Sequence, residues 1–238
     1  MADALPKVDR ALLSMLVRGA EKTFENAERL YFEAEHLAKV EATARALCLH
    51  QISLEECSKI ESIGAWATTL LAGVGVDQDK VLAALRRHSS KNRNNAYMME
   101  GSQAEKDAKA RRDWEGMREA FTEFQKEFHA TSNDAKNASL YVDWKDGEFV
   151  SPREQITDGM LAQIIERNQA FLGYAQNSLN MLRRLDKSPE DLQGLVVDFI
   201  DSAKKLRVEM PDDPVTAGNQ LVRQFIDAGL KKLSRKQD

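Results

Sequence analysis

The sequence predicts an all-α protein, an antiparallel helical bundle with one small β-hairpin near residues 139–150. Between Pro6 and Pro152 there is no proline, the strongest helix breaker, so several long helices are permitted. Apolar residues recur at steps of three and four over most of the chain, which is typical of amphipathic helices. Aromatic residues make up only 7% of the 238 residues, which argues against an all-β sandwich or barrel.

The N-terminal third predicts two long antiparallel helices, at about 9–39 and 41–72. Apolar and small residues from Leu13 onward form one stripe of the first helix, and the pattern resumes in the second. The break between them contains neither glycine nor proline, so its position is poorly defined by the sequence. The glycines in the segment 73–75 are typical of a helix C-terminal cap.

The rest of the chain predicts shorter helices around the hairpin. Alternating apolar residues flank Asp146-Gly147, a tight-turn sequence, and we expect this hairpin to pack onto the helices because an isolated hairpin is marginally stable. No repeat or obvious linker divides the chain, so residues 1–238 are expected to form a single helical domain. The remaining elements are a short helix near 79–90, a polar segment at 86–102, a helix at about 103–131, and helices at 153–185, 188–207 and 212–235.

Composition excludes several classes of protein. With 34 basic and 38 acidic residues the net charge is −4, so the chain is no generally basic nucleic-acid binder, although a local basic patch remains possible. No apolar run approaches the roughly 18 residues that span a bilayer, and the N-terminus lacks the apolar segment of a signal peptide, so we expect a cytoplasmic protein without a membrane partner. Familiar metal-ligand and nucleotide-binding spacings are missing, so no metal or cofactor is expected.

The first candidate site is the segment that contains Glu55, Glu56 and Lys59. Glu55 and Lys59 have the spacing of a surface ion pair on an exposed helix face. The alternative places these acids and the base in a cleft, where a low dielectric strengthens their pairing and shifts their pKa values.

The second candidate site is the run from Arg86 to Asn95, which holds four cations and one histidine without any acid. Arginine and lysine side chains can hold phosphates, and a histidine can transfer protons near neutral pH. RNA cleavage through the 2′-hydroxyl needs both functions. The alternative is a solvated loop with a surface histidine.

Four segments together resemble the AbiV family of abortive-infection proteins, which is similar to the wider HEPN group of helical domains. They are ENAERLYFEAEHL, ALCLHQISLEECSKI, RRHSSKN and KNASLYVDWKDGEFVSP. Their most specific features are the EE-x-x-K helix, the following H-x-x-K, and the K-N-x-x-L-Y-V-D segment. The resemblance covers about residues 10–155, whereas the C-terminal helices at 153–235 match only in being helical.

The resemblance implies a HEPN-like bundle, a role in phage defence, and a homodimer. Many HEPN domains are ribonucleases that use an R-x(4–6)-H motif without a metal. Near the basic cluster no arginine is followed by histidine at that spacing: after Arg93 the corresponding positions hold Met98, Met99 and Glu100. Either the nuclease site is rearranged, or the fold serves for binding and not for cleavage.

The leading hypothesis is therefore an antiphage effector that acts on RNA, the ribosome or tRNA. If it is a metal-independent endoribonuclease, we expect His88 to be the acid and base. The alternative is a non-catalytic helical binding or dimerisation protein that a phage product activates. In the nuclease hypothesis the residues that complete the site are Lys91, Arg93 and Arg87 on the phosphate, Asn94 positioning the substrate, and Glu55, Glu56 and Lys59 lining the same cleft.

Overall fold

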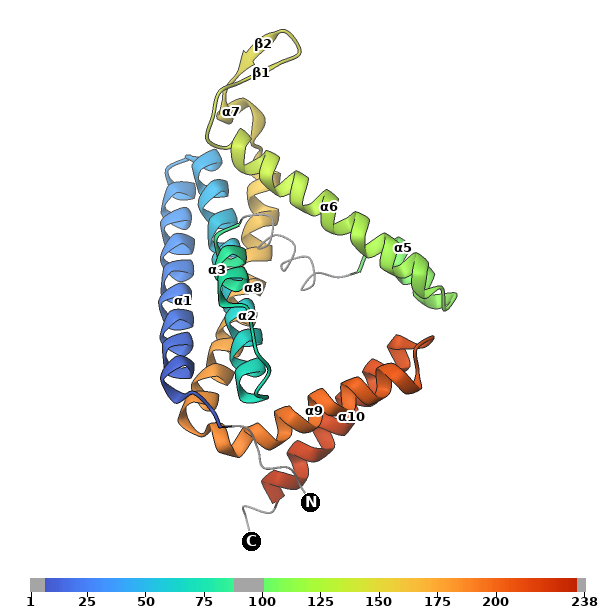
Figure 1. Cartoon of the computed structure of the whole chain (residues 1–238). Helices are drawn as coiled ribbons and strands as arrows, with labels where there is room; N and C mark the ends of the chain where they lie inside the picture. Colours follow the sequence, from blue (N-terminus) through green and yellow to red (C-terminus); the bar gives the residue numbers. More distant parts are fainter. Residues whose placement is uncertain (1–6, 88–100, 235–238) are drawn as a thin grey trace.

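The computed structural model describes residues 7–87 and 101–234 (Figure 1). It is almost entirely helical, with one two-stranded sheet among the described residues, so the predicted fold class is confirmed. The elements are α1 (Arg10–Lys39), α2 (Thr43–Leu71), α3 (Gln78–Arg86), α5 (Gln103–Ala110), α6 (Trp114–Ala138), β1 (Asp143–Lys145), β2 (Glu148–Val150), α7 (Pro152–Gln155), α8 (Asp158–Lys187), α9 (Pro189–Glu209) and α10 (Pro214–Ser234).

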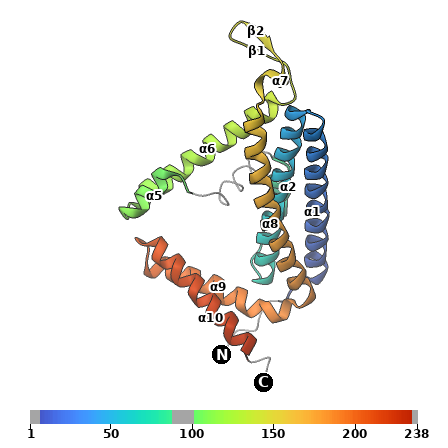
Figure 2. The same ribbon diagram turned by 180° about the vertical axis from the view of Figure 1, so that it is seen from behind.

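Helices α1, α2 and α8 form the central bundle (Figures 1 and 2). Helix α1 is antiparallel to both other helices. At one end Ser14 Oγ donates to Asp186 at 2.6 Å, and further along Glu21 accepts from Arg183 Nε at 2.8 Å. The apolar stripe predicted for α1 lies in the core that these three helices share.

Two helical arms leave this bundle on the same side (Figures 1 and 2). One is formed by α5 and α6, and the other by α9 and α10, whose Phe199 and Phe225 rings meet edge to face at 5.2 Å. In the turn between α9 and α10, the hydrogen bonds that Asp213 accepts from Thr216 lower its pKa, and the charge of Arg112 makes a smaller contribution in the same direction.

The prediction of a single helix at 103–131 is wrong, because the helix is interrupted between α5 and α6. Arg112 adopts a left-handed conformation with φ 56°, and Asp113 N and Arg112 N bond back to Ala108 O and Lys109 O. This is a Schellman C-cap. Asp113 then caps α6 by accepting from Gly116 N at 2.9 Å. The helix expected at 153–185 is likewise divided, since Thr157 accepts from Met160 N and starts α8 after the short α7.

The hairpin forms as predicted but does not pack onto the helices. Its turn residues Asp146 and Gly147 both have positive φ, as a two-residue type I′ turn requires. Trp144 and Phe149 pair across the strands with their ring centroids 4.9 Å apart. All of residues 140–149 are exposed, so the hairpin projects from the end of the bundle (Figure 1).

None of the described helices combines the length and apolarity needed to cross a membrane.

Candidate functional site

Helix α2 is unusual because its middle is polar and yet buried. It packs against α1, α8 and α6, so little of its circumference faces solvent. Burying a polar side chain is costly unless a partner satisfies it. The buried polar residues of α2, which we call the α2 polar row, are His50, Gln51, Ser53, Glu55, Glu56 and Ser58.

A hydrogen-bond network joins the start of the α2 polar row to α1 and α8. Ser53 Oγ donates to Ala27 O at 2.7 Å, and it also contacts Asn168 Oδ1 at 3.2 Å. Asn168 Nδ2 lies 3.2 Å from His50 Nδ1, which accepts from this amide. Because Ala27 belongs to α1 and the fully buried Asn168 belongs to α8, this network connects all three helices of the bundle.

His50 is completely buried, and its environment favours the neutral imidazole. Desolvation lowers its pKa, although the Glu35 carboxylate acts in the opposite direction. His50 Nε2 lies 3.4 Å from Glu35 Oε1, but the geometry does not make a hydrogen bond. The Tyr31 ring packs edge-on against the imidazole with a centroid distance of 5.0 Å.

Glu55, the first acid of the EE-x-x-K segment, pairs with Lys136 and not with Lys59. Lys136 Nζ lies 3.1 Å from Glu55 Oε1, and the two side chains are 11% and 0% exposed. Lys59 instead pairs with Glu56, one turn earlier on α2. The interpretation of Glu55 and Lys59 as an exposed surface pair is therefore wrong.

The Glu55–Lys136 pair joins two of the three segments that are most specific for the AbiV resemblance. Glu55 belongs to the EE-x-x-K helix, and Lys136 begins the K-N-x-x-L-Y-V-D segment at the end of α6. A second contact between these segments involves Cys48 and Ser139: burial raises the pKa of the Cys48 thiol, while its hydrogen bond to Ser139 acts in the opposite direction. Spacing within one helix could not reveal either partner.

Neither cysteine has the environment of a nucleophile. Cys48 and Cys57 are both buried and free. Desolvation, with a smaller contribution from the Glu56 charge, raises the pKa of Cys57 to about 12, so its thiol is protonated near neutral pH. In the described part of the chain no three His, Cys, Asp or Glu side chains cluster as metal ligands would.

The basic cluster lies mainly outside the described residues. The structure does not describe residues 88–100, which include His88, Lys91, Arg93 and Asn94. The placement of these four residues near the α2 polar row therefore stays a prediction. Arg87 is described: it is exposed and ends α3 as its C-cap.

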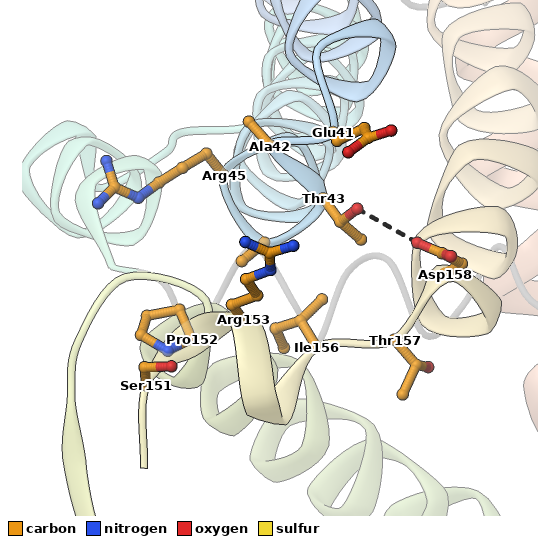
Figure 3. Close-up of a pocket in the computed structure, with 11 residues that line it drawn as sticks. Glu41, Ala42, Thr43, Arg45, Ser151, Pro152, Arg153, Ile156, Thr157 and Asp158 are labelled. Carbon is orange, nitrogen blue, oxygen red and sulfur yellow. Dashed lines mark hydrogen bonds between the residues drawn. The ribbon is translucent and has the colours of Figure 1, made fainter. Parts of the chain in front are cut away.

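A pocket of about 740 Å³ opens at the end of the bundle from which the hairpin projects (Figure 3). Arg45 comes from the first turn of α2, and Arg153 comes from α7. Both guanidinium groups are exposed, and neither forms an ion pair with another described residue. Glu41 and Asp158 also line the pocket, and Thr43 Oγ1 donates to Asp158 Oδ1 at 3.2 Å. The Arg45 side chain extends away from these two acids (Figure 3).

Arg45 is also part of an arginine–histidine spacing that lies outside the basic cluster. Four residues separate Arg45 from His50, and six separate Arg29 from His36, so the R-x(4–6)-H spacing occurs twice outside the basic cluster. In the structure the first pair does not converge: Arg45 lines the exposed pocket, and His50 is buried among Asn168 and its neighbours. A search of the whole sequence for this spacing would have found both pairs.

The bundle with its polar central helix and its projecting hairpin defines the class of this molecule: an all-α protein with a HEPN-like fold. The chain belongs to the HEPN_AbiV family, whose profile, described as AbiV, matches residues 15–173. The match extends beyond the expected limit near residue 155 and includes the first half of α8, with Asn168. This membership indicates an abortive-infection or HEPN-type function.

One similar protein comes from Sinorhizobium fredii (strain NBRC 101917 / NGR234) and is called uncharacterized protein y4gJ. It is 58% identical over 112 residues, which are 47% of this chain and 58% of that protein. The chain thus spans less than two thirds of this relative. No solved structure matches the chain.

Proposed function

We propose that this protein is an abortive-infection effector that halts phage production by acting on RNA or the translation machinery. Family membership supports the defence role. The observation that supports this choice of target is the presence of two arginines, Arg45 and Arg153, at one pocket, neither with an ion-pair partner in the part of the chain that the structure describes (Figure 3). A guanidinium group donates two parallel hydrogen bonds to a phosphate, and its charge persists at any physiological pH. In this proposal the protein acts in the cytoplasm, where RNA and ribosomes are located.

RNA cleavage is one way in which such an effector could act. In this mechanism His88 takes the proton of the 2′-hydroxyl and protonates the leaving oxygen, while Lys91, Arg93 and Arg87 hold the phosphate and Asn94 positions the substrate. Cleavage without a metal follows from this chemistry, because an imidazole supplies the proton transfer and the cations stabilise the charge. Glu55 and Glu56 belong to the buried α2 polar row, and the half-buried Lys59 pairs with Glu56, so in this proposal the three residues support the site from behind.

The first experiment incubates the purified protein with total bacterial RNA and tRNA in EDTA. The wild type is compared with His88→Ala and with the double variant Arg45→Gln/Arg153→Gln. Cleavage that persists in EDTA and is lost in His88→Ala supports the nuclease mechanism. Loss of RNA binding in the double arginine variant supports the pocket, and unchanged binding would remove the pocket from the proposal. Arg183→Gln is a matched control, because Arg183 is half-exposed and paired with Glu21.

A non-catalytic effector that a phage product activates is the second candidate. The burial of His50 favours it, because the histidine of the Arg45–His50 spacing cannot reach a substrate in this arrangement. An in vitro translation assay separates the two candidates. Slower translation with all RNA intact supports the binding effector. Cleavage of the RNA whose loss slows translation excludes the binding effector.

We also propose that the protein acts as a homodimer through the hairpin. Tyr141, Val142, Trp144 and Phe149 are 58–73% exposed, and such adjoining apolar side chains commonly mark an interface. Sedimentation at micromolar concentration should show a dimer for the wild type and a monomer for Trp144→Ser/Phe149→Ser. A wild-type monomer would refute this part. The variant should keep its helical circular dichroism, since both side chains lie outside the core.

A further inference from the structure

A second pocket lies between α2, α6 and α8, where α6 leaves the bundle. Its volume is about 280 Å³, at the lower end of the range for small-molecule sites. None of the residues that line it also lines the Arg45 pocket. Its wall is largely apolar and includes Leu47, Phe124, Phe128, Ala135, Met160 and Ile164.

Arg167 of α8 places a charge in this apolar surrounding. Its guanidinium carbon lies 5.4 Å from the centroid of the Phe128 ring, over which it stacks. The side chain is half-buried, and desolvation lowers its pKa. Glu127 also lines the pocket, but Arg167 makes no ion pair or hydrogen bond with any residue of the described ranges. A desolvated guanidinium remains charged, so the missing counter-ion is costly.

Gln51 is one of the other polar residues of this pocket, together with Glu127, Thr131, Ser132 and Gln163. It belongs to the α2 polar row and is only 3% exposed. Its amide nitrogen Nε2 is buried and has no hydrogen-bond partner among the described residues. Buried polar groups are nearly always satisfied in folded proteins, so an orphaned donor beside an unpaired cation indicates a missing acceptor.

We propose that this pocket binds a small organic oxyanion: a phosphate or carboxylate carried on an aromatic or other apolar group. Arg167 donates from its guanidinium edge to two oxygens of the anion, because its face is stacked on Phe128. Gln51 donates from its amide to the same group. The apolar body of the ligand packs against Phe124, Met160 and Ile164. This proposal does not depend on RNA as the target of the protein.

Phenyl phosphate is a suitable probe, because it carries both features of the expected ligand. Isothermal titration calorimetry should show saturable binding to the full-length wild type, at least tenfold tighter than binding of inorganic phosphate. Arg167→Gln should weaken phenyl phosphate binding at least tenfold, and Gln51→Leu should weaken it severalfold. Arg167→Lys keeps a charge without the fork geometry and should bind with intermediate affinity.

The control variant is Arg184→Gln, which removes the same charge from an exposed position of the same helix. Its affinity should equal that of the wild type. Circular dichroism of each variant separates loss of the ligand from loss of the fold. No saturable binding to the wild type, an unchanged affinity in folded Arg167→Gln, or equal affinities for phenyl phosphate and inorganic phosphate would each overturn the proposal.

Benzoate and 5′-AMP then identify the source of the oxyanion. Tighter binding of benzoate indicates a carboxylate metabolite, and tighter binding of 5′-AMP indicates a nucleotide; both preserve the proposed site. RNA cleavage and translation are measured separately, so a failure of this site and a failure of the proposed function give different results.

Discussion

The buried ion pair between Glu55 and Lys136 allows a quantitative test of the structure. At the observed separation of 3.1 Å, two unit charges attract each other by about 5 kcal/mol for an effective dielectric constant of about 20. Desolvation costs several kcal/mol for each ion and offsets most of this attraction. The pair therefore contributes little net stability, but removing one partner leaves a buried charge without this counter-charge.

Lys136→Met should accordingly lower the free energy of unfolding by about 3–5 kcal/mol. For a protein of this size the loss corresponds to a fall in Tm of about 6–20 °C. The double variant Glu55→Leu/Lys136→Met removes both charges from the low-dielectric site and should recover most of the loss. Urea denaturation followed by far-UV circular dichroism measures all three proteins at pH 7.

An exposed pair of nearly equal length provides the control. Lys204 Nζ lies 3.0 Å from Asp201 Oδ1, and these side chains are 70% and 63% exposed. Lys204→Met should change stability by less than about 1 kcal/mol, because solvent screens an exposed pair. If Lys136→Met costs no more than Lys204→Met, or if the double variant is as unstable as Lys136→Met, the reasoning about burial is refuted.

Two further predictions concern local features of the fold. Arg112→Gly should raise the free energy of unfolding by about 1 kcal/mol in the same urea assay, because glycine adopts the left-handed conformation without strain. The control Arg111→Gly, at a right-handed position, should lower the free energy of unfolding. The second prediction concerns His50, whose imidazole faces Glu35 and Tyr31 and has a lowered pKa in the folded protein. Below the ordinary histidine pKa of about 6.5, the unfolded chain binds a proton at His50, whereas the folded protein does not. His50 should therefore lower the free energy of unfolding by up to about 1.4 kcal/mol for each pH unit below 6.5, until the pH reaches the pKa of the folded imidazole. His50→Gln should reduce the dependence of the free energy of unfolding on pH between pH 6.5 and 5.5. An unchanged pH dependence would contradict a neutral buried imidazole.

The helix ends show why some boundaries are predictable and others are not. Three helices end in the same Schellman hydrogen-bond pattern, with Gly73, Glu41 or Arg112 in the left-handed position. Glycine is the residue that favours this conformation, so the end of α2 can be predicted from the sequence. Glutamate and arginine carry no such signal, so the sequence defines the boundary after α1 poorly and does not indicate the break before α6.

The candidate site is less predictable because its contacts join distant parts of the chain. Periodicity identifies the apolar face of a helix, but it assumes that polar residues face solvent. Helix α2 contradicts this assumption, since α1, α6 and α8 pack against it and its buried Ser53, Glu55 and His50 contact Ala27 O, Lys136 and Asn168, respectively. Those partners are 26, 81 and 115 residues away along the sequence from the groups they contact.

Two of the three most specific family motifs, EE-x-x-K and K-N-x-x-L-Y-V-D, therefore meet each other inside the molecule. Glu55 and Lys136 use their charges on one another, and the low exposure of both side chains keeps a phosphate backbone from reaching them in this arrangement. Side chains that recognise a large external target have to be exposed and free of internal ion pairs. Arg45 and Arg153 satisfy both conditions among the described residues, and Arg87 is exposed at the start of the basic cluster. It follows that the motif which identifies the family mainly positions α2 against α6, and that contact with RNA or ribosome is to be tested first at these exposed arginines.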